Sequence, residues 1–217
     1  MKYVSSRNKN EIVESHNAII QGLAKDGGLF TPENINIHIN VDKLTNLSYQ
    51  QIATKVIHAF LDDFTEEEIS SSVNQAYDNK FDTEEIVPLH KIEDAYLMEL
   101  YHGPTSAFKD IALTLLPHLL IQSYNKENRH DTISILTATS GDTGKAALAG
   151  FADVKGTKII VFYPKHGVSP IQEKQMVTQK GDNTYVVGIE GNFDDDQTGV
   201  KTMFGDSELA KELDADG

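Results

Sequence analysis

The sequence predicts an α/β fold, in which a helical N-terminal region is followed by a mostly parallel sheet with helices on both faces. Apolar residues recur at helical spacing in the first ninety or so residues, and the period shortens after Glu85. Three strand-like runs then alternate with helical patterns, which is typical of parallel sheets. We therefore expect a helical N-terminal domain at residues 1–95 and an α/β lobe at residues 96–217.

Three helices are expected in the N-terminal region. The first covers about residues 11–24 and ends at the turn signal of residues 26–28, Asp-Gly-Gly. The next two begin at capping boxes, whose side chains satisfy the free backbone N–H groups of a first helical turn. Behind each box, an apolar stripe is expected to face the core. The boxes are Ser48 with Gln51 and Thr65 with Glu68, and the stripes are Ile52, Val56, Ala59, Phe60 and Ile69, Val73, Ala76, Tyr77.

The middle of the chain predicts two short strands and a broken helix. Residues 86–92 and 96–100 read as strands that pair through a turn at residues 93 and 94. A helix follows from about Ala107 and is kinked or ended near Pro117, because proline lacks the backbone N–H and clashes with the preceding turn.

The last part of the chain predicts the parallel sheet itself. The helix between its second and third strands is the best marked, with Ser169 as N-cap, Pro170 at the first position and Gln172 completing a capping box. Ligands of such sheets bind beyond the carboxyl ends of the strands. The three strands are expected at residues 132–138, 158–163 and 184–189.

Composition and charge exclude several classes of function. The 217 residues contain 19 Lys and Arg against 33 Asp and Glu, a net charge of −14, which opposes binding to nucleic acid or to an anionic membrane. A hydrophobic fraction of 39% argues against global disorder, and 0 Cys excludes disulfides and thiolate metal sites. The first ten residues lack the apolar region of a secretion signal, and residues 111–121 are too short to span a membrane. We expect a cytoplasmic protein.

Residues 137–145, TATSGDTGK, predict an anion-binding loop between a strand and a helix. Glycines let the backbone approach a ligand, and the free N–H groups of a helix start attract an anion. The alternative is a tight turn with Ser140 or Asp142 as a simple N-cap. A nucleotide-binding P-loop does not fit, because that motif requires Gly where Thr139 stands and Ser or Thr where Ala146 stands.

Residues 101–110, YHGPTSAFKD, contain a lysine in apolar company. The neighbours of Lys109 include Phe108 and Ile111, and such surroundings favour the neutral, nucleophilic amine that can form a Schiff base. Alone, one lysine near a helix start is more often a surface residue. Its combination with the anion loop is what indicates a reactive site.

In order and spacing, these motifs resemble threonine synthases of the pyridoxal-phosphate fold-type II superfamily. The resemblance spans nearly the whole chain, and family members are about twice as long, so we expect an N-terminal fragment. The matching segments are QGLAKDGGLFTPE at residues 21–33, HGPTSAFKD at 102–110, ATSGDTG at 138–144 and SPIQEKQM at 169–176.

The resemblance implies that Lys109 is the catalytic residue, holds the cofactor pyridoxal 5′-phosphate through a Schiff base and moves protons once the substrate amine displaces it. Asp142 would bind the cofactor. Many fold-type II enzymes have Asn at this position, and an Asn amide can donate a hydrogen bond, whereas an ionised Asp can only accept one. Residues implied to bind the substrate, through its α-carboxylate, are Thr139, Ser140, Gly141 and Thr143.

The implied substrate is the small molecule O-phospho-L-homoserine, which would be converted with water to L-threonine and phosphate. The helix start at Ser169 would help to bind the substrate phosphate, or is an ordinary cap. In this superfamily the cup for the cofactor phosphate and the partner of the pyridine nitrogen lie in the later half, so these 217 residues alone are expected to turn over little. The acidic end of residues 190–217 is expected to be solvated.

Two alternatives stay open from the sequence. One is another fold-type II activity such as a serine or threonine dehydratase, and the other is a non-catalytic protein that binds phosphometabolites. His102 is expected to be structural, and His58, His118 and His130 show no metal-ligand spacing. No oligomeric state is predicted.

Overall fold

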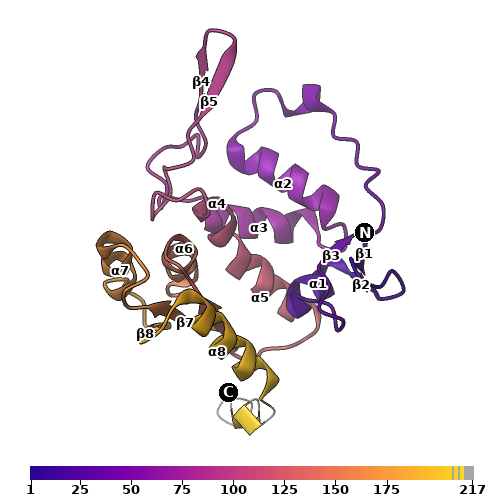
Figure 1. Ribbon diagram of the computed structural model, residues 1–217. Helices are drawn as coiled ribbons and strands as arrows, with labels where there is room; N and C mark the ends of the chain where they lie inside the picture. Colours follow the sequence, from indigo (N-terminus) through magenta and orange to yellow (C-terminus); the bar gives the residue numbers. More distant parts are fainter. Residues whose placement is uncertain (207, 210, 213–217) are drawn as a thin grey trace. The chain divides into compact units, whose positions relative to one another are not determined.

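The computed structural model describes residues 1–206, 208–209 and 211–212 (Figure 1). Contacts within the chain divide it into two compact units, which are described separately below. The first unit contains Met1–Pro88 and His118–Arg129, and the second contains Leu89–Pro117 and His130–Gly217. The predicted domain boundary after residue 95 stays a prediction, and the acidic residues Asp214 and Asp216 lie outside the described residues.

The first unit begins with a small antiparallel sheet that the sequence analysis did not predict. Strand β1 (Lys2–Ser5) lies between β2 (Ile12–Glu14) and β3 (Phe30–Pro32). The helix expected at residues 11–24 is therefore shorter, because its first residues pair with β1, and α1 covers only Ser15–Gln21. A 3₁₀ turn follows at Val41–Leu44.

Two helices of the first unit confirm the sequence prediction. Helix α2 (Tyr49–Phe60) and helix α3 (Glu66–Ala76) both begin with the expected capping boxes. The stripe of α3 is buried, including Ile69 and Val73, each with 0% exposure, whereas the stripe of α2 is half-buried. Local capping and helical periodicity were sufficient to predict both elements.

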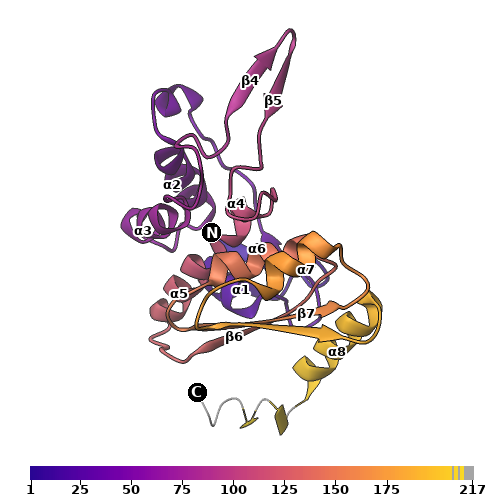
Figure 2. The ribbon, with the colours of Figure 1, turned by 90° about the vertical axis from the view of Figure 1, so that its left-hand side faces the viewer.

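The second unit begins with the predicted hairpin. Strands β4 (Leu89–Ile92) and β5 (Ala95–Met98) pair antiparallel around a turn in which Glu93 adopts a left-handed φ of 52°. All the residues of both strands are exposed, and Figure 2 shows the hairpin standing away from the parallel sheet of the same unit.

The expected break near Pro117 separates two helices. Helix α4 is one turn at Asp110–Leu113, and α5 runs over Leu116–Lys126, beginning in the second unit and continuing in the first. Pro117 lies in the first turn of α5, where its missing N–H has no partner to lose.

The parallel sheet has the order β6-β7-β8 and agrees with the prediction within two residues at each end. Figure 2 shows α6 and α7 on one face of the sheet and α8 on the other. The core includes Leu148, Ile159 and Val161, each with 0% exposure. The strands are β6 (Ile133–Ala138), β7 (Thr157–Pro164) and β8 (Thr184–Ile189), and the helices are α6 (Asp142–Phe151), α7 (Pro170–Val177) and α8 (Phe193–Gly205).

Within the described part of the chain, no helix combines the length and the apolar character that crossing a membrane requires. The same residues contain no cluster of three or more His, Asp or Glu side chains able to hold a metal ion.

Candidate functional site

The segment before α4 holds Lys109 in a fixed place through its neighbour Asp110. The Asp110 carboxylate is fully buried and accepts hydrogen bonds from the backbone N–H of Thr105 at 2.8 Å and from its hydroxyl at 2.6 Å. A Cβ on Gly103 would lie 2.5 to 2.9 Å from atoms of the Asp110 side chain, so this turn requires glycine. The GPTSAFKD sequence therefore closes into a tight loop that ends at Lys109.

Lys109 lines an apolar pocket of about 410 Å³ in the second unit. Its ammonium lies 4.5 Å from the centroid of the Phe108 ring, an interaction between a cation and an aromatic face. Thr143, from the anion loop, lines the same pocket. The other lining residues are Leu100, Phe108, Ile111, Ala112 and Leu113.

The anion loop follows the carboxyl end of β6 and is shaped by the buried Thr139. The Thr139 hydroxyl accepts hydrogen bonds from the N–H groups of Gly141, at 3.0 Å, and Gly144, at 2.9 Å. Gly141 has a φ of 136°, and a Cβ there would meet the Gln172 side chain at 2.5 Å, so only glycine fits.

Three N–H groups of this loop are left for a ligand. In the described chain, the backbone N–H groups of Ser140, Asp142 and Thr143 make no hydrogen bond, and they cluster at the start of α6. Helix starts with free N–H groups bind anions. The loop can therefore hold a carboxylate or a phosphate beside the Lys109 pocket.

The carboxylate of Asp142 is fixed within this loop by two donors. Gln172 Nε2 donates to Asp142 Oδ1 at 2.8 Å, and the ammonium of Lys145 lies 3.2 Å from the same oxygen. The hydrogen bond from Gln172, outweighing partial burial, and then the nearby cations Lys145 and Lys109 hold the pKa of Asp142 below its usual value. Asp142 is therefore an anion at neutral pH.

Ser169 caps α7 as the sequence predicts. Its hydroxyl accepts from the N–H of Gln172 at 3.3 Å, and the Gln172 side-chain oxygen accepts from the N–H of Ser169 at 3.0 Å. Because Gln172 also donates to Asp142, the start of α7 and the anion loop are in direct contact. Binding of the substrate phosphate by Ser169 stays a prediction.

His102 has a structural environment. Its Nε2 lies 2.7 Å from Glu99 Oε2, and its ring stacks on Tyr101 with 4.6 Å between centroids. The hydrogen bonds from His102 and Tyr101 lower the pKa of Glu99. These contacts fix the chain where it enters residues 103–110, the segment with Lys109 that we call the lysine loop.

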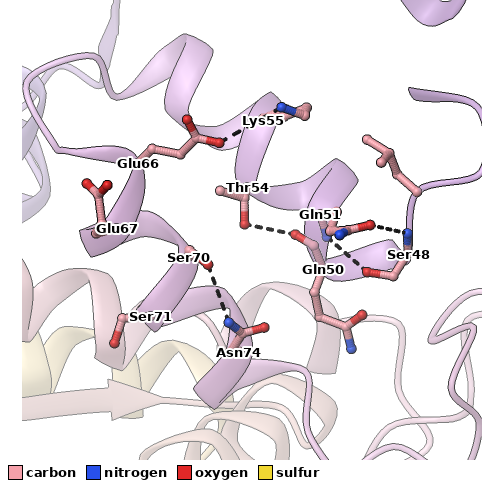
Figure 3. Close-up of a pocket in the computed structure, with 11 residues that line it drawn as sticks. Ser48, Gln50, Gln51, Thr54, Lys55, Glu66, Glu67, Ser70, Ser71 and Asn74 are labelled. Carbon is pink, nitrogen blue, oxygen red and sulfur yellow. Dashed lines mark hydrogen bonds and ion pairs between the residues drawn. The ribbon is translucent and has the colours of Figure 1, made fainter. Parts of the chain in front are cut away.

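A larger hollow of about 940 Å³ lies in the first unit, between α2 and α3 (Figure 3). Several of the polar groups that line it bond to one another. Ser48 and Gln51 form the capping box, Thr54 donates to the carbonyl of Gln50, and Asn74 donates to Ser70. Lys55, which lines this hollow, is paired with Glu66 at 3.9 Å. Lys109 lines an apolar pocket together with Thr143 of the anion loop, so the pocket at Lys109 is the candidate site.

The sequence analysis identified Lys109 and the anion loop, and the structure places Lys109 and Thr143 at one pocket. It did not identify the positioning contacts of Asp110, Lys145 and Gln172. Lys145 directly follows the SGDTG sequence, and this position is a signal for its role. The sequence analysis considered this lysine only when it compared residues 137–145 with a P-loop.

Fold and site together define an α/β protein with a lysine pocket beside an anion loop. Comparison with known proteins shows what this chain is similar to. Residues 2–77 match the family model described as threonine synthase N terminus. The chain is 35% identical to the threonine synthase of Eremothecium gossypii, covering 95% of this chain and 44% of that protein, and 35% identical to that of Pseudomonas aeruginosa, covering 97% and 45%.

A solved structure agrees with these relatives. The crystal structure of pyridoxal-phosphate-bound threonine synthase from Brucella melitensis matches with a TM-score of 0.90 and 35% identity, over 99% of this chain and 46% of that one. By sequence and by fold, the chain is similar to the amino-terminal part of threonine synthases. It spans less than half the length of these relatives.

Proposed function

We propose that the protein that contains this chain is a threonine synthase, a carbon–oxygen lyase that acts on a phosphate ester. It converts O-phospho-L-homoserine and water to L-threonine and phosphate, with pyridoxal 5′-phosphate as cofactor. The observation that supports this best is the common pocket of Lys109 and the anion-loop residue Thr143. The proposed compartment is the cytoplasm.

The residues present fit the cofactor. The pocket of about 410 Å³ is almost wholly apolar and Lys109 is one of its lining residues, which suits a flat aromatic ring held through an amine. When bound, pyridoxal phosphate supplies an electron sink for carbanion chemistry. Lys109 would hold it, and Asp142 is the proposed contact from the loop.

Lys109 is proposed to act as the proton carrier of the reaction. Lys109 lines the same pocket as Thr143 of the anion loop, and its amine is proposed to remove a proton from the substrate Cα and to return one later. The apolar side chains of Phe108 and Ile111 line the same pocket. Asp110 and Thr105 keep its backbone in place.

The anion loop is proposed to bind and orient the substrate α-carboxylate. The free N–H groups of Ser140 and Thr143 are the donors, and Gly141 permits the backbone turn that exposes them. The buried Thr139 stabilises the loop through the hydrogen bonds that its hydroxyl accepts from the N–H groups of Gly141 and Gly144. The helix start at Ser169 is proposed for the substrate phosphate.

Labelling tests the proposal on the protein expressed from its complete reading frame. The protein is incubated with pyridoxal phosphate, reduced with borohydride and mapped by peptide mass spectrometry. We expect one label, on Lys109, with Lys145 as the internal comparison because it is the lysine that contacts Asp142 of the anion loop. A label on Lys145 or on surface lysines would contradict the assignment.

The same protein distinguishes the alternatives. A threonine synthase releases phosphate from O-phospho-L-homoserine, whereas a dehydratase acts on serine or threonine. A phosphometabolite-binding protein would bind the phosphate ester without labelling Lys109. Lys109→Ala is expected to abolish turnover and to change the melting temperature little, because a pocket-lining lysine contributes little burial.

A further inference from the structure

Lys145 is a nearly buried cation between the two segments that form the candidate site. Only 11% of its side chain is exposed. Its ammonium lies 3.2 Å from Asp142 Oδ1 in the anion loop and donates to the backbone carbonyl of Thr105, at 3.3 Å, in the lysine loop. All three residues belong to the second unit.

These two contacts connect Lys109 to the anion loop. Thr105 is bonded to Asp110, the residue that follows Lys109. Asp142 stands between the free N–H groups at the start of α6. A continuous set of hydrogen bonds therefore runs from the lysine loop through Lys145 to the residues that would hold an anion.

The charge of Lys145 matters as much as its position. Asp142 is an anion beside N–H groups that would bind a second anion, and like charges repel. Gln172 donates to Asp142 but carries no charge, so the cations near this carboxylate are Lys145 and Lys109. Once the Lys109 amine is engaged in chemistry, Lys145 supplies the remaining compensation.

We propose that Lys145 is a positioning residue of the site, which neutralises Asp142 and holds the anion loop against the lysine loop so that the loop can bind the substrate carboxylate. The inference rests on the proposed function and adds a residue to it. Lys145 acts through Asp142 and Thr105, and it needs no contact with substrate.

The experiment uses the complete protein with pyridoxal phosphate and O-phospho-L-homoserine. Lys145→Gln keeps a polar side chain without charge, Lys145→Arg keeps the charge, and Lys155→Gln removes an exposed lysine as a matched control. The double variant Lys145→Gln with Asp142→Asn removes both charges. Circular dichroism checks the folding of each variant.

For Lys145→Gln we expect the KM to rise about tenfold, equal to about 1.4 kcal/mol of binding, and kcat to change less. A second readout is independent of turnover. The midpoint of the pH titration of the bound cofactor's absorption should move to higher pH, because Asp142 without the cation Lys145 favours the protonated form of the amine group at Lys109. Lys145→Arg should restore both values, and the double variant should recover most of the lost affinity.

The outcomes separate this inference from the proposed function. If wild-type protein does not carry the cofactor on Lys109, the proposed function fails. If it does, and Lys145→Gln changes neither KM nor the spectral midpoint, the positioning role is overturned. An equal loss in Lys145→Arg, or no recovery in the double variant, overturns the electrostatic part. If neither Lys145→Gln nor Lys145→Met folds, Lys145 is a stability residue and the inference is rejected.

Discussion

Replacing His16 by alanine should destabilise the protein in a way that depends on pH. His16 bridges two carboxylates from distant parts of the first unit. Its Nδ1 lies 2.5 Å from Asp63 Oδ2, and its Nε2 lies 2.6 Å from Glu127 Oε1. Asp63 is also held by the Ser15 hydroxyl and by the backbone N–H of His16.

The magnitude follows from exposure. The His16 and Asp63 side chains are 12% and 16% exposed, so their charged hydrogen bond is worth about 1.5–3 kcal/mol. Glu127 is 43% exposed, so solvent screens its charge and its bond to His16 adds little. His16→Ala should therefore lower the free energy of unfolding by about 1.5–3 kcal/mol near pH 6.

The pH dependence follows from both partners. Burial lowers the pKa of His16, but the hydrogen bonds to Asp63 and Glu127 outweigh it and raise the pKa above 6.5. The contribution of His16 is thus fully present below about pH 6.5 and is lost as the pH rises through its raised pKa. Burial raises the pKa of Asp63, but hydrogen bonds from Ser15 and His16 leave it below 3.8, so its contribution is lost only on acidification.

Urea unfolding followed by circular dichroism between pH 4 and 9 measures this difference, with the exposed His130→Ala as control. The difference between wild type and His16→Ala should be largest between about pH 4.5 and 6.5 and smaller at pH 9. If the difference in unfolding free energy does not change with pH, the bridge is not charged. If the difference stays below about 0.5 kcal/mol at every pH, the His16–Asp63 bond is not protected from solvent as the structure shows.

Two further substitutions test packing and burial. Asp196 on α8 is 3% exposed, and neither carboxylate oxygen has a hydrogen-bond partner within the described chain. Burial, followed by the charge of Asp195, raises its pKa, so the ionised form destabilises the fold at neutral pH. Asp196→Asn should raise the free energy of unfolding by about 1 kcal/mol at pH 7 and lose this advantage near pH 4, and an unchanged urea midpoint at pH 7 would contradict it. Gly144→Ala would place a Cβ 2.8 Å from Val161 Cγ1 and 2.9 Å from Thr139 Cβ. Thermal unfolding should show that the free energy of unfolding falls by about 1–3 kcal/mol. An unchanged stability would contradict this and would mean that the loop can relax.

The sequence predicted those elements whose signals are local. The capping boxes at Ser48, Thr65 and Ser169 are each complete within four residues, and all three helices begin where expected. The small sheet of the first unit was missed because its strands have three or four residues and pair across the chain, Tyr3 opposite both Val13 and Pro32. No pattern within so short a strand distinguishes it from a loop or the start of a helix.

The site shows the same division between local and distant information. Lys109 and the glycine-containing loop could be identified, because each motif is a contiguous run with a chemical meaning. The partners that position them could not, since the bonds from Lys145 to Thr105 and from Gln172 to Asp142 join residues 40 and 30 positions apart. Such contacts depend on how the helices and loops pack around the sheet.

The dual role of Gln172 explains why the two later motifs depend on each other. Its oxygen accepts from the N–H of Ser169 while its nitrogen donates to Asp142, so one side chain both starts α7 and fixes the anion loop. A Cβ at position 141 would collide with this side chain, which ties the glycine of the loop to the glutamine of the helix. The SGDTG and SPIQ sequences therefore constrain one another through a single amide, and neither can change its shape without moving the N–H groups that would bind the anion.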